Sequence, residues 1–231
     1  GPGYRSADSM DNELRAAAVT VDLSFPHSWH AQILRERPLI LPSLHYTYPR
    51  QAEEVERGAL EVMISPAAAA PFLATFALGF TDPAVPTGLW SCPAEDELCA
   101  VAGGYAYVVD TRRPERFTHV AFRPVLEVRP VPEHRLLLFA GHHSLLAWGP
   151  DGQAWESPRL SWEGLRLVNI TNNELHGFGW DLLTDRDVPF TLDLRTGAHG
   201  GLEGVHDLAF QGVHLDQHMQ NDARLDPRRF D

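Results

Sequence analysis

The sequence contains no lysine, because all 19 basic residues among its 231 residues are arginine. Chemistry that needs a lysine Schiff base, or the lysine of a phosphate-binding loop, is therefore excluded. A GC-rich genome, whose codons favour Arg, Ala, Gly and Pro together, explains the absence. Avoidance of lysine-directed modification is the alternative.

Cysteine is also scarce: the two cysteines, Cys92 and Cys99, are separated by a short acidic segment. Two thiols alone make a poor metal site, and no Arg or His flanks either thiol to lower its pKa. In a cytoplasmic protein such a pair is more often reduced than linked. We expect no nucleophilic cysteine, and we expect Cys99 to be a small buried hydrophobic residue.

Long apolar runs and an excess of basic charge are missing as well. No stretch approaches the length of a membrane span, and no basic start leads into an apolar segment with a cleavage site. The chain has 31 acidic and 19 basic residues, a net charge of -12. Such a charge repels nucleic acid and anionic membranes. We expect a soluble, cytoplasmic, acidic protein with no nucleic-acid partner and no membrane partner.

The motifs of several enzyme classes are absent. The sequence has no Gly-x-Ser-x-Gly, no phosphate-binding loop and no dinucleotide fingerprint after a strand. A carboxylate pair for glycoside hydrolysis stays open, because such a pair is assembled from distant positions. We therefore predict no cofactor and name no catalytic residue.

The chain divides by composition into four segments. Residues 1–9 are typical of an expression-tag remnant, and residues 10–66 are expected to form strands with Pro-rich connections. Residues 67–211 are expected to form a β-repeat domain, and residues 212–231 a polar tail. Within 10–66 the patterns predict a short helix over 12–18, a strand over 19–23, a helical turn over 32–37 and a strand after Gly58.

Three segments align with a period near forty residues, and their first strands start at Leu98, Leu136 and Leu175. Each has an apolar strand, a small-residue turn, a second apolar strand and an acidic turn. Further strands are expected over residues 117–122, 125–129, 155–160 and 165–170. Four short strands at this period are typical of a propeller blade. We predict a mostly β fold of antiparallel four-stranded, propeller-like repeats, with a β-sandwich or open barrel as the alternative.

Two turn segments, residues 148–155 and 191–197, resemble the Asp-x-x-Thr-Gly-x-x-x-Trp segment of quinoprotein-type β-propeller blades. The resemblance covers about residues 73–201; the first copy has a shortened turn and the second lacks the tryptophan. In that family the motif closes one blade on the next, so the resemblance implies a structural role and no catalytic residue. The tryptophans of this region are expected to pack between strands, with a sugar or peptide platform as the alternative; they are Trp148, Trp155, Trp162 and Trp180.

Turns at one rim of the repeats form the candidate binding site. Equivalent positions of stacked repeats face the same way, so we expect one shallow pocket formed by Gly104, His142, His143, Trp180 and Asp181. The aspartates of the opposite rim are expected to accept local backbone hydrogen bonds; they are Asp110, Asp151 and Asp193. We predict a non-catalytic domain that binds a protein partner, as an inhibitor or immunity-type factor with a basic target. The alternative is a hydrolase or metal-dependent enzyme that uses His and Asp at that rim.

Histidines near the end of the sequence have a spacing found in metal sites. His214 and His218 lie four residues apart and would share a helix face, with His206 upstream. The segment lacks the Glu of the metalloprotease helix and is polar throughout. We therefore predict no metal site, and specifically that His199, His206, His214 and His218 do not hold a structural metal.

Overall fold

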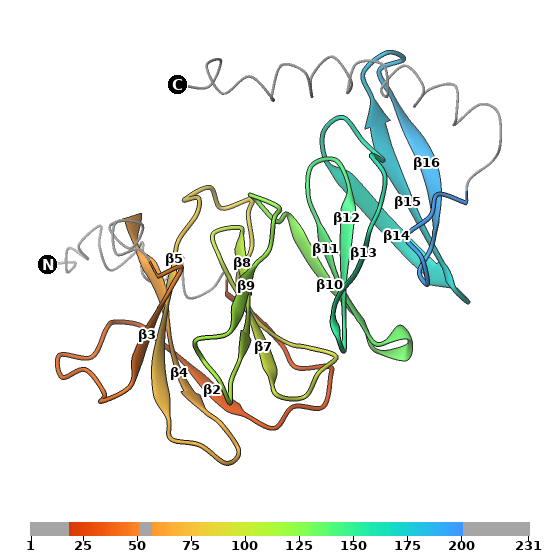
Figure 1. Ribbon diagram of the computed structural model, residues 1–231. Helices are drawn as coiled ribbons and strands as arrows, with labels where there is room; N and C mark the ends of the chain where they lie inside the picture. Colours follow the sequence, from red (N-terminus) through yellow and green to blue (C-terminus); the bar gives the residue numbers. More distant parts are fainter. Residues whose placement is uncertain (1–18, 51–56, 201–231) are drawn as a thin grey trace, which may run out of the picture. The chain divides into compact units, whose positions relative to one another are not determined.

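The computed structural model describes residues 19–50 and 57–200, and almost all of their regular structure is strand (Figure 1). The strands in chain order are β1 Val19–Asp22, β2 His30–Leu34, β3 His45–Tyr48, β4 Ala59–Ser65, β5 Phe72–Ala77, β6 Thr87–Ser91, β7 Glu97–Ala102, β8 Tyr105–Asp110, β9 Phe117–His119, β10 Glu127–Val131, β11 Leu136–Ala140, β12 Leu145–Gly149, β13 Gly152–Glu156, β14 Leu165–Thr171, β15 Glu174–Asp181 and β16 Arg186–Asp193. A 3-10 turn, η2 (Pro132–His134), lies between β10 and β11. The predicted mostly β fold is confirmed, whereas the helix expected over residues 12–18 lies outside the described residues.

The strands form four sheets with open strand orders. Sheet A has the order β1-β6-β7-β8-β9, sheet B β2-β4-β5-β3, sheet C β10-β11-β12-β13 and sheet D β14-β15-β16. Sheet C, sheet D and most of sheet A are built from consecutive antiparallel strands, as in a propeller blade. In sheet A the added strand β1 pairs in parallel with β6, and in sheet B β3 pairs in parallel with β5.

The forty-residue repeat predicted from the sequence corresponds to one pair of neighbouring strands in each of three sheets. The expected first strands are β7, β11 and β15, and the expected second strands are β8, β12 and β16. Register pairs such as Leu98↔Val109 and Leu175↔Leu192 join them. The outer strands expected over 117–122, 125–129 and 165–170 are found as β9, β10 and β14, whereas the strand expected over 155–160 is displaced: β13 ends at Glu156, and residues 157–160 form no strand. The propeller-like repeat is therefore confirmed at the level of strands and sheets.

Central strands of sheets A, B and C are buried on both faces, whereas the central strand of sheet D is not. Every residue of β5, β11 and β12 is buried, and β7 and β8 are exposed in part only at their ends. Such strands need apolar side chains on both faces, which is why they read as continuous apolar runs. In β15 burial alternates along the strand instead. One face of sheet D is therefore packed and the other is partly open.

The chain divides into two compact units. The first comprises residues 1–141 and 147–154, and the second residues 142–146 and 155–231. The core of the first unit lies between sheets A and B and contains a chain of aromatic contacts. Tyr48 stacks on Phe76 at 5.0 Å between ring centroids, and Phe76 lies 5.5 Å from Tyr107. The domain boundaries expected from composition stay a prediction.

The helical turn predicted over residues 32–37 is wrong. Residues 30–34 form β2, in which Ala31 pairs with Ile64 and Ile33 with Val62 of β4. Because Ala31 and Ile33 pack against the apolar core, burial on a sheet overrides the helix propensity of the segment. The strands predicted over residues 19–23 and after Gly58 are confirmed as β1 and β4.

No helix in the described part of the chain is long and apolar enough to cross a membrane.

Candidate functional site

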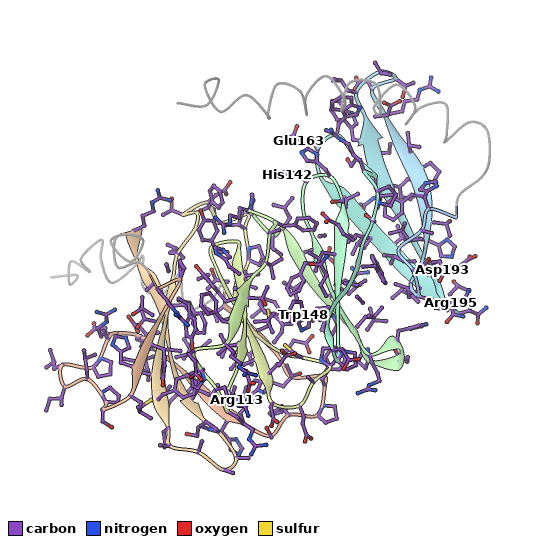
Figure 2. All side chains as sticks on the ribbon, viewed as in Figure 1. Arg113, His142, Trp148, Glu163, Asp193 and Arg195 are labelled. Carbon is purple, nitrogen blue, oxygen red and sulfur yellow. The ribbon has the colours of Figure 1, made fainter. Side chains whose placement is uncertain are left out.

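The segment that connects β13 to β14 along the chain, residues 157–164, is hydrogen-bonded to His142 and His143. The carbonyl of His143 accepts hydrogen bonds from the backbone N–H groups of Leu160 at 2.7 Å and Ser161 at 3.2 Å. The carbonyl of His142 accepts one from Gly164 at 2.7 Å. Figure 2 shows His142 and Glu163 at the same end of the second unit. The backbone of this segment thus fixes the position of both histidines.

The same segment holds Trp180 at the end of β15. The backbone N–H of Trp180 donates to Ser161 Oγ at 2.9 Å, and the backbone N–H of Trp162 donates to the Trp180 carbonyl at 2.9 Å. On its other side, the carbonyl oxygen of Ser161 lies 3.3 Å from His143 Nδ1. The structure therefore brings together three of the residues expected at this rim, His142, His143 and Trp180, with Ser161 between them.

Two further side chains of this segment were not among the residues expected to form the pocket: Arg159, and Trp162, which was expected to pack between strands or, alternatively, to form a sugar or peptide platform. The guanidinium of Arg159 lies 4.2 Å from the ring centroid of Trp162, within the range of a cation–π contact. Trp162 is half-buried, and its indole N–H has no hydrogen-bond partner among the described residues. The sequence feature that could have pointed to Arg159 and Trp162 is an aromatic residue close to charged residues in a short connection between two strands. We call His142, His143, Trp162 and Trp180 the rim site.

Asp181 is fully buried and holds the turn that follows β15. Its Oδ1 accepts a hydrogen bond from the N–H of Leu183 at 3.2 Å, and its Oδ2 accepts one from Thr184 Oγ1 at 2.9 Å. The carboxylates of Asp110 and Asp193 accept backbone hydrogen bonds in the same way, from Arg112 and Arg195. The Asp181 carboxylate thus stabilises the turn, while the tip of the turn exposes Leu182 and Leu183.

Trp180 is one of three half-exposed side chains along the open face of β15. His176, Phe178 and Trp180 alternate with buried positions. The guanidinium of Arg166 lies 4.6 Å from the Phe178 ring centroid, and Trp180 Nε1 donates to Asp185 Oδ1 at 3.1 Å. Sheet D therefore presents a row of aromatic and imidazole rings that runs to the rim site.

Gly104, the fifth residue expected at the rim, lies in the first unit. It follows Gly103 in the turn between β7 and β8, and both have positive φ values, of +54° and +80°. The Gly104 carbonyl accepts a hydrogen bond from Val125 at 2.7 Å, and a Cβ at Gly104 would lie 2.6 Å from Pro124 Cβ. Only glycine suits this backbone and this close approach.

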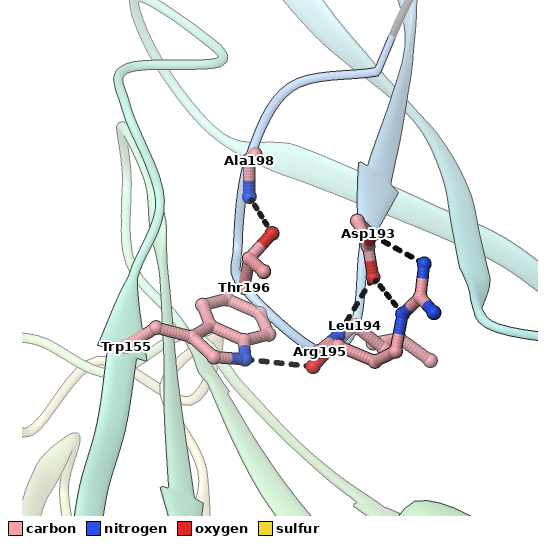
Figure 3. Close-up of polar contacts among 6 residues, drawn as sticks. All are labelled: Trp155, Asp193, Leu194, Arg195, Thr196 and Ala198. Carbon is pink, nitrogen blue, oxygen red and sulfur yellow. Dashed lines mark hydrogen bonds and ion pairs between the residues drawn. The ribbon is translucent and has the colours of Figure 1, made fainter.

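At the end of the second unit away from His142, Trp155 contacts the turn that follows β16 (Figures 2 and 3). Its indole N–H donates to the Leu194 carbonyl at 2.7 Å in the turn after β16. Gly197 lies against the ring, where a Cβ would be only 2.4 Å from a ring carbon. Within the second unit, Trp155 therefore ties the end of β13 to the turn after β16.

A row of hydrogen-bonded side chains crosses sheet B. His45 Nε2 lies 2.7 Å from Thr75 Oγ1, which donates to Glu61 Oε2 at 2.5 Å, while Arg37 Nε donates to Glu61 Oε1 at 3.1 Å. Thr75 is fully buried. Because its hydroxyl proton is engaged by Glu61 and no path leads to it, this row is suited to stabilising the sheet rather than to nucleophilic catalysis.

An open pocket of about 310 Å³ lies along β3 in the first unit. Its strongest donors are engaged in its own walls: the Tyr48 hydroxyl donates to the Pro114 carbonyl at 2.5 Å, and Arg50 donates to the Glu115 carbonyl at 2.9 Å. Engaged donors offer little to a polar ligand.

Metal ligands do not gather in the described part of the chain, where no group of three or more His, Cys, Asp or Glu side chains could hold an ion. Of the histidines with metal-like spacing, His206, His214 and His218 lie outside the described residues. The expectation that they hold no metal stays a prediction.

The two thiols are free and fully buried. Burial raises the pKa of both, and the nearby Glu97 carboxylate adds to the effect. The reactive thiolate is therefore disfavoured in the folded state. The expectation that Cys99 is a small buried hydrophobic residue is confirmed.

No family model matches the sequence, so the quinoprotein resemblance has no support at the family level, and no curated protein matches either. Among solved structures, the crystal structure of the N-terminal domain of Nup159 is 12% identical over 79% of this chain and 52% of that chain, with a TM-score of 0.32. An S. cerevisiae complex of a Dbp5 variant with Nup159, a Gle1 variant, IP6 and ADP is 11% identical over 75% and 49%, also with a TM-score of 0.32. This chain spans about half the length of both matched chains.

Proposed function

We propose that this chain is a non-catalytic β-repeat domain that binds a protein partner through the second unit, at the rim site and the open face of β15. The observation that carries the proposal is the alternating burial of β15. It leaves Phe178 and Trp180 half-exposed on a sheet whose other face is packed. Aromatic residues on a rigid strand supply contact area with little loss of conformational entropy on binding.

The chemistry of this surface favours a protein partner over a small substrate. Trp180 and Phe178 offer apolar area, the His142 imidazole offers a polar edge, and the turn beside them exposes Leu182 and Leu183. Apolar contacts bordered by polar groups are the usual composition of a protein interface. The net charge of -12 favours a basic partner, as an inhibitor or immunity-type factor with a basic target would require.

The test compares wild type with the double variant His142→Ala/Trp180→Ala. Each protein is used to capture partners from cells that make it, and a protein enriched by wild type is purified and its Kd measured. We expect the double variant to bind at least tenfold more weakly, since the central aromatic residues of an interface contribute most to affinity. Arg195→Ala, an exposed change at the other end of the unit, is the matched control and is expected to bind normally.

Circular dichroism and thermal melting establish that the variants are folded. A folded double variant that binds the purified partner as tightly as wild type does would place the interface elsewhere and reject the proposed site.

A further inference from the structure

The connection between β2 and β3 exposes an unusual amount of aliphatic surface. We call residues 38–44 the apolar loop; its sequence is Pro-Leu-Ile-Leu-Pro-Ser-Leu. Leu39 is fully exposed and Ile40 is 88% exposed, and Leu41 and Leu44 are also counted among the exposed large hydrophobics. Contiguous exposed aliphatic side chains mark interaction sites more often than isolated ones do.

The apolar loop is anchored at both ends. Just before it, Arg37 forms an ion pair with Glu61 of β4, with Nε 3.1 Å from Oε1, and Glu61 is itself buried. At its other end, the Leu44 carbonyl accepts a hydrogen bond from the N–H of Leu73 in β5 at 3.0 Å. The exposed residues therefore project from a fixed base.

Two prolines, Pro38 and Pro42, bracket the most exposed residues. Each locks its own φ, and each restricts the residue before it to extended backbone. A segment held in this way loses little conformational freedom when it binds. The apolar loop is thus an extended, partly pre-organised ligand for a pocket or groove rather than a pocket itself.

The net charge of the chain indicates which kind of partner covers the apolar loop. Two copies of a chain with a net charge of -12 repel each other, and an anionic bilayer repels the chain as well. The residues that lead into the apolar loop, Arg35, Glu36 and Arg37, are exposed and carry both signs, and Arg37 is itself paired with Glu61. A border of both signs fits the polar rim of a protein interface, whereas a membrane-binding loop carries basic residues.

We propose that the apolar loop inserts into an apolar pocket on a partner protein of neutral or positive net charge. The inference rests on the proposed function only in that both require a protein partner. The apolar loop belongs to the first unit and the rim site to the second, so separate variants test them.

The experiment places a photo-crosslinking amino acid at position 40 of the full chain and identifies the protein that becomes attached in cells. That protein is purified, and its Kd is measured for wild type and for Leu39→Ser/Ile40→Ser. We expect the variant to bind at least tenfold more weakly with an unchanged melting temperature. Val21→Ser/Leu23→Ser, which removes two exposed aliphatic residues elsewhere in the first unit, is the matched control and is expected to keep its affinity within twofold.

Three results would overturn the proposal. One is the absence of any crosslinked protein at position 40, and another is equal affinity of the variant for the purified protein. The third is an effect confined to self-association by sedimentation, or to binding of phosphatidylcholine vesicles, which would assign the apolar loop to a second copy or to a bilayer. Loss of binding in His142→Ala/Trp180→Ala alone would reject the apolar loop and leave the proposed function standing.

Discussion

At the scale of single residues, aromatic side chains with one polar atom connect parts of the chain that are far apart in sequence. Trp148 Nε1 donates to Glu97 Oε1 at 3.0 Å, and Trp29 Nε1 donates to the Glu97 carbonyl at 2.9 Å. Trp155 makes the corresponding contact in the second unit. Each indole buries apolar area and satisfies its N–H in one step. Most of their stabilisation comes from packing, with the hydrogen bond adding specificity of position.

Trp155→Phe tests the size of that polar contribution. The change keeps most of the packing but leaves the Leu194 carbonyl without this donor, so we expect a loss of about 1 kcal/mol in the free energy of unfolding. Trp180→Phe removes a solvent-exposed hydrogen bond to Asp185 and is expected to cost clearly less. Urea unfolding of both variants measures the difference. Equal losses would mean that burial of the Trp155 hydrogen bond is unimportant.

His119 predicts a specific dependence of stability on pH. Burial and the neighbouring Arg123 lower its pKa to about 4, against about 6.5 in the unfolded chain. Between these values the unfolded state binds more protons, so stability falls as the pH falls from about 6.5 toward 4 and is unaffected by this group above that window. In His119→Gln this part of the pH dependence should vanish, and a variant that keeps it would show that another group causes it. Thermal melting of wild type and His119→Gln between pH 4.5 and 7.5 measures this dependence.

At the scale of elements, the sequence pattern was informative wherever strands are consecutive and apolar. The runs that became β7, β8, β11 and β12 could be predicted because burial on both faces demands continuous apolar residues. β2 was missed because Gln32 and Arg35 raise the local helix propensity, while the pairing with β4 that decides its conformation is distant in sequence. The parallel pairing of β3 with β5 has no local signal either.

The candidate site could be predicted only in part, because some of its contacts join residues without a local sequence pattern. His142, His143 and Trp180 could be aligned because they lie in or directly before equivalent turns of the repeat. Ser161, which lies between them, sits in an irregular segment without periodicity, so only the folded backbone shows that it joins the two turns.

Gly104→Ala tests the tight turn between β7 and β8. We expect a loss of about 1–3 kcal/mol in the free energy of unfolding, because alanine is strained at φ +80° and its Cβ would press against Pro124. Gly152 also has a positive φ, of +107°, but a Cβ there would meet nothing within 4 Å. Gly152→Ala therefore measures the backbone strain alone, and denaturant unfolding should find Gly104→Ala the more destabilised. The reverse order would show that the contact with Pro124 yields easily.

At the scale of the whole molecule, the net charge of -12 is expected to govern how fast a partner arrives. Electrostatic attraction raises association rates more than it strengthens final contacts, and salt screens it. With the purified partner, we expect the association rate constant to fall at least fivefold between low salt and about 0.5 M NaCl. The dissociation rate should change much less. Stopped-flow measurements separate the two, and an association rate that does not respond to salt would mean that the acidic surface lies away from the encounter.

The two buried cysteines beside and within sheet A can report how often this sheet opens. Cys92 follows β6 and Cys99 lies within β7, and both are fully covered in the folded state. An alkylating reagent can reach them only when the sheet opens, so the labelling rate reports the opening of the sheet without any introduced cysteine. When closing is fast relative to labelling, the rate gives the free energy of opening; at high reagent concentration it gives the opening rate itself. Equal labelling rates at the two cysteines would indicate that sheet A opens as one cooperative unit, and unequal rates would show that the two positions become exposed in separate opening events.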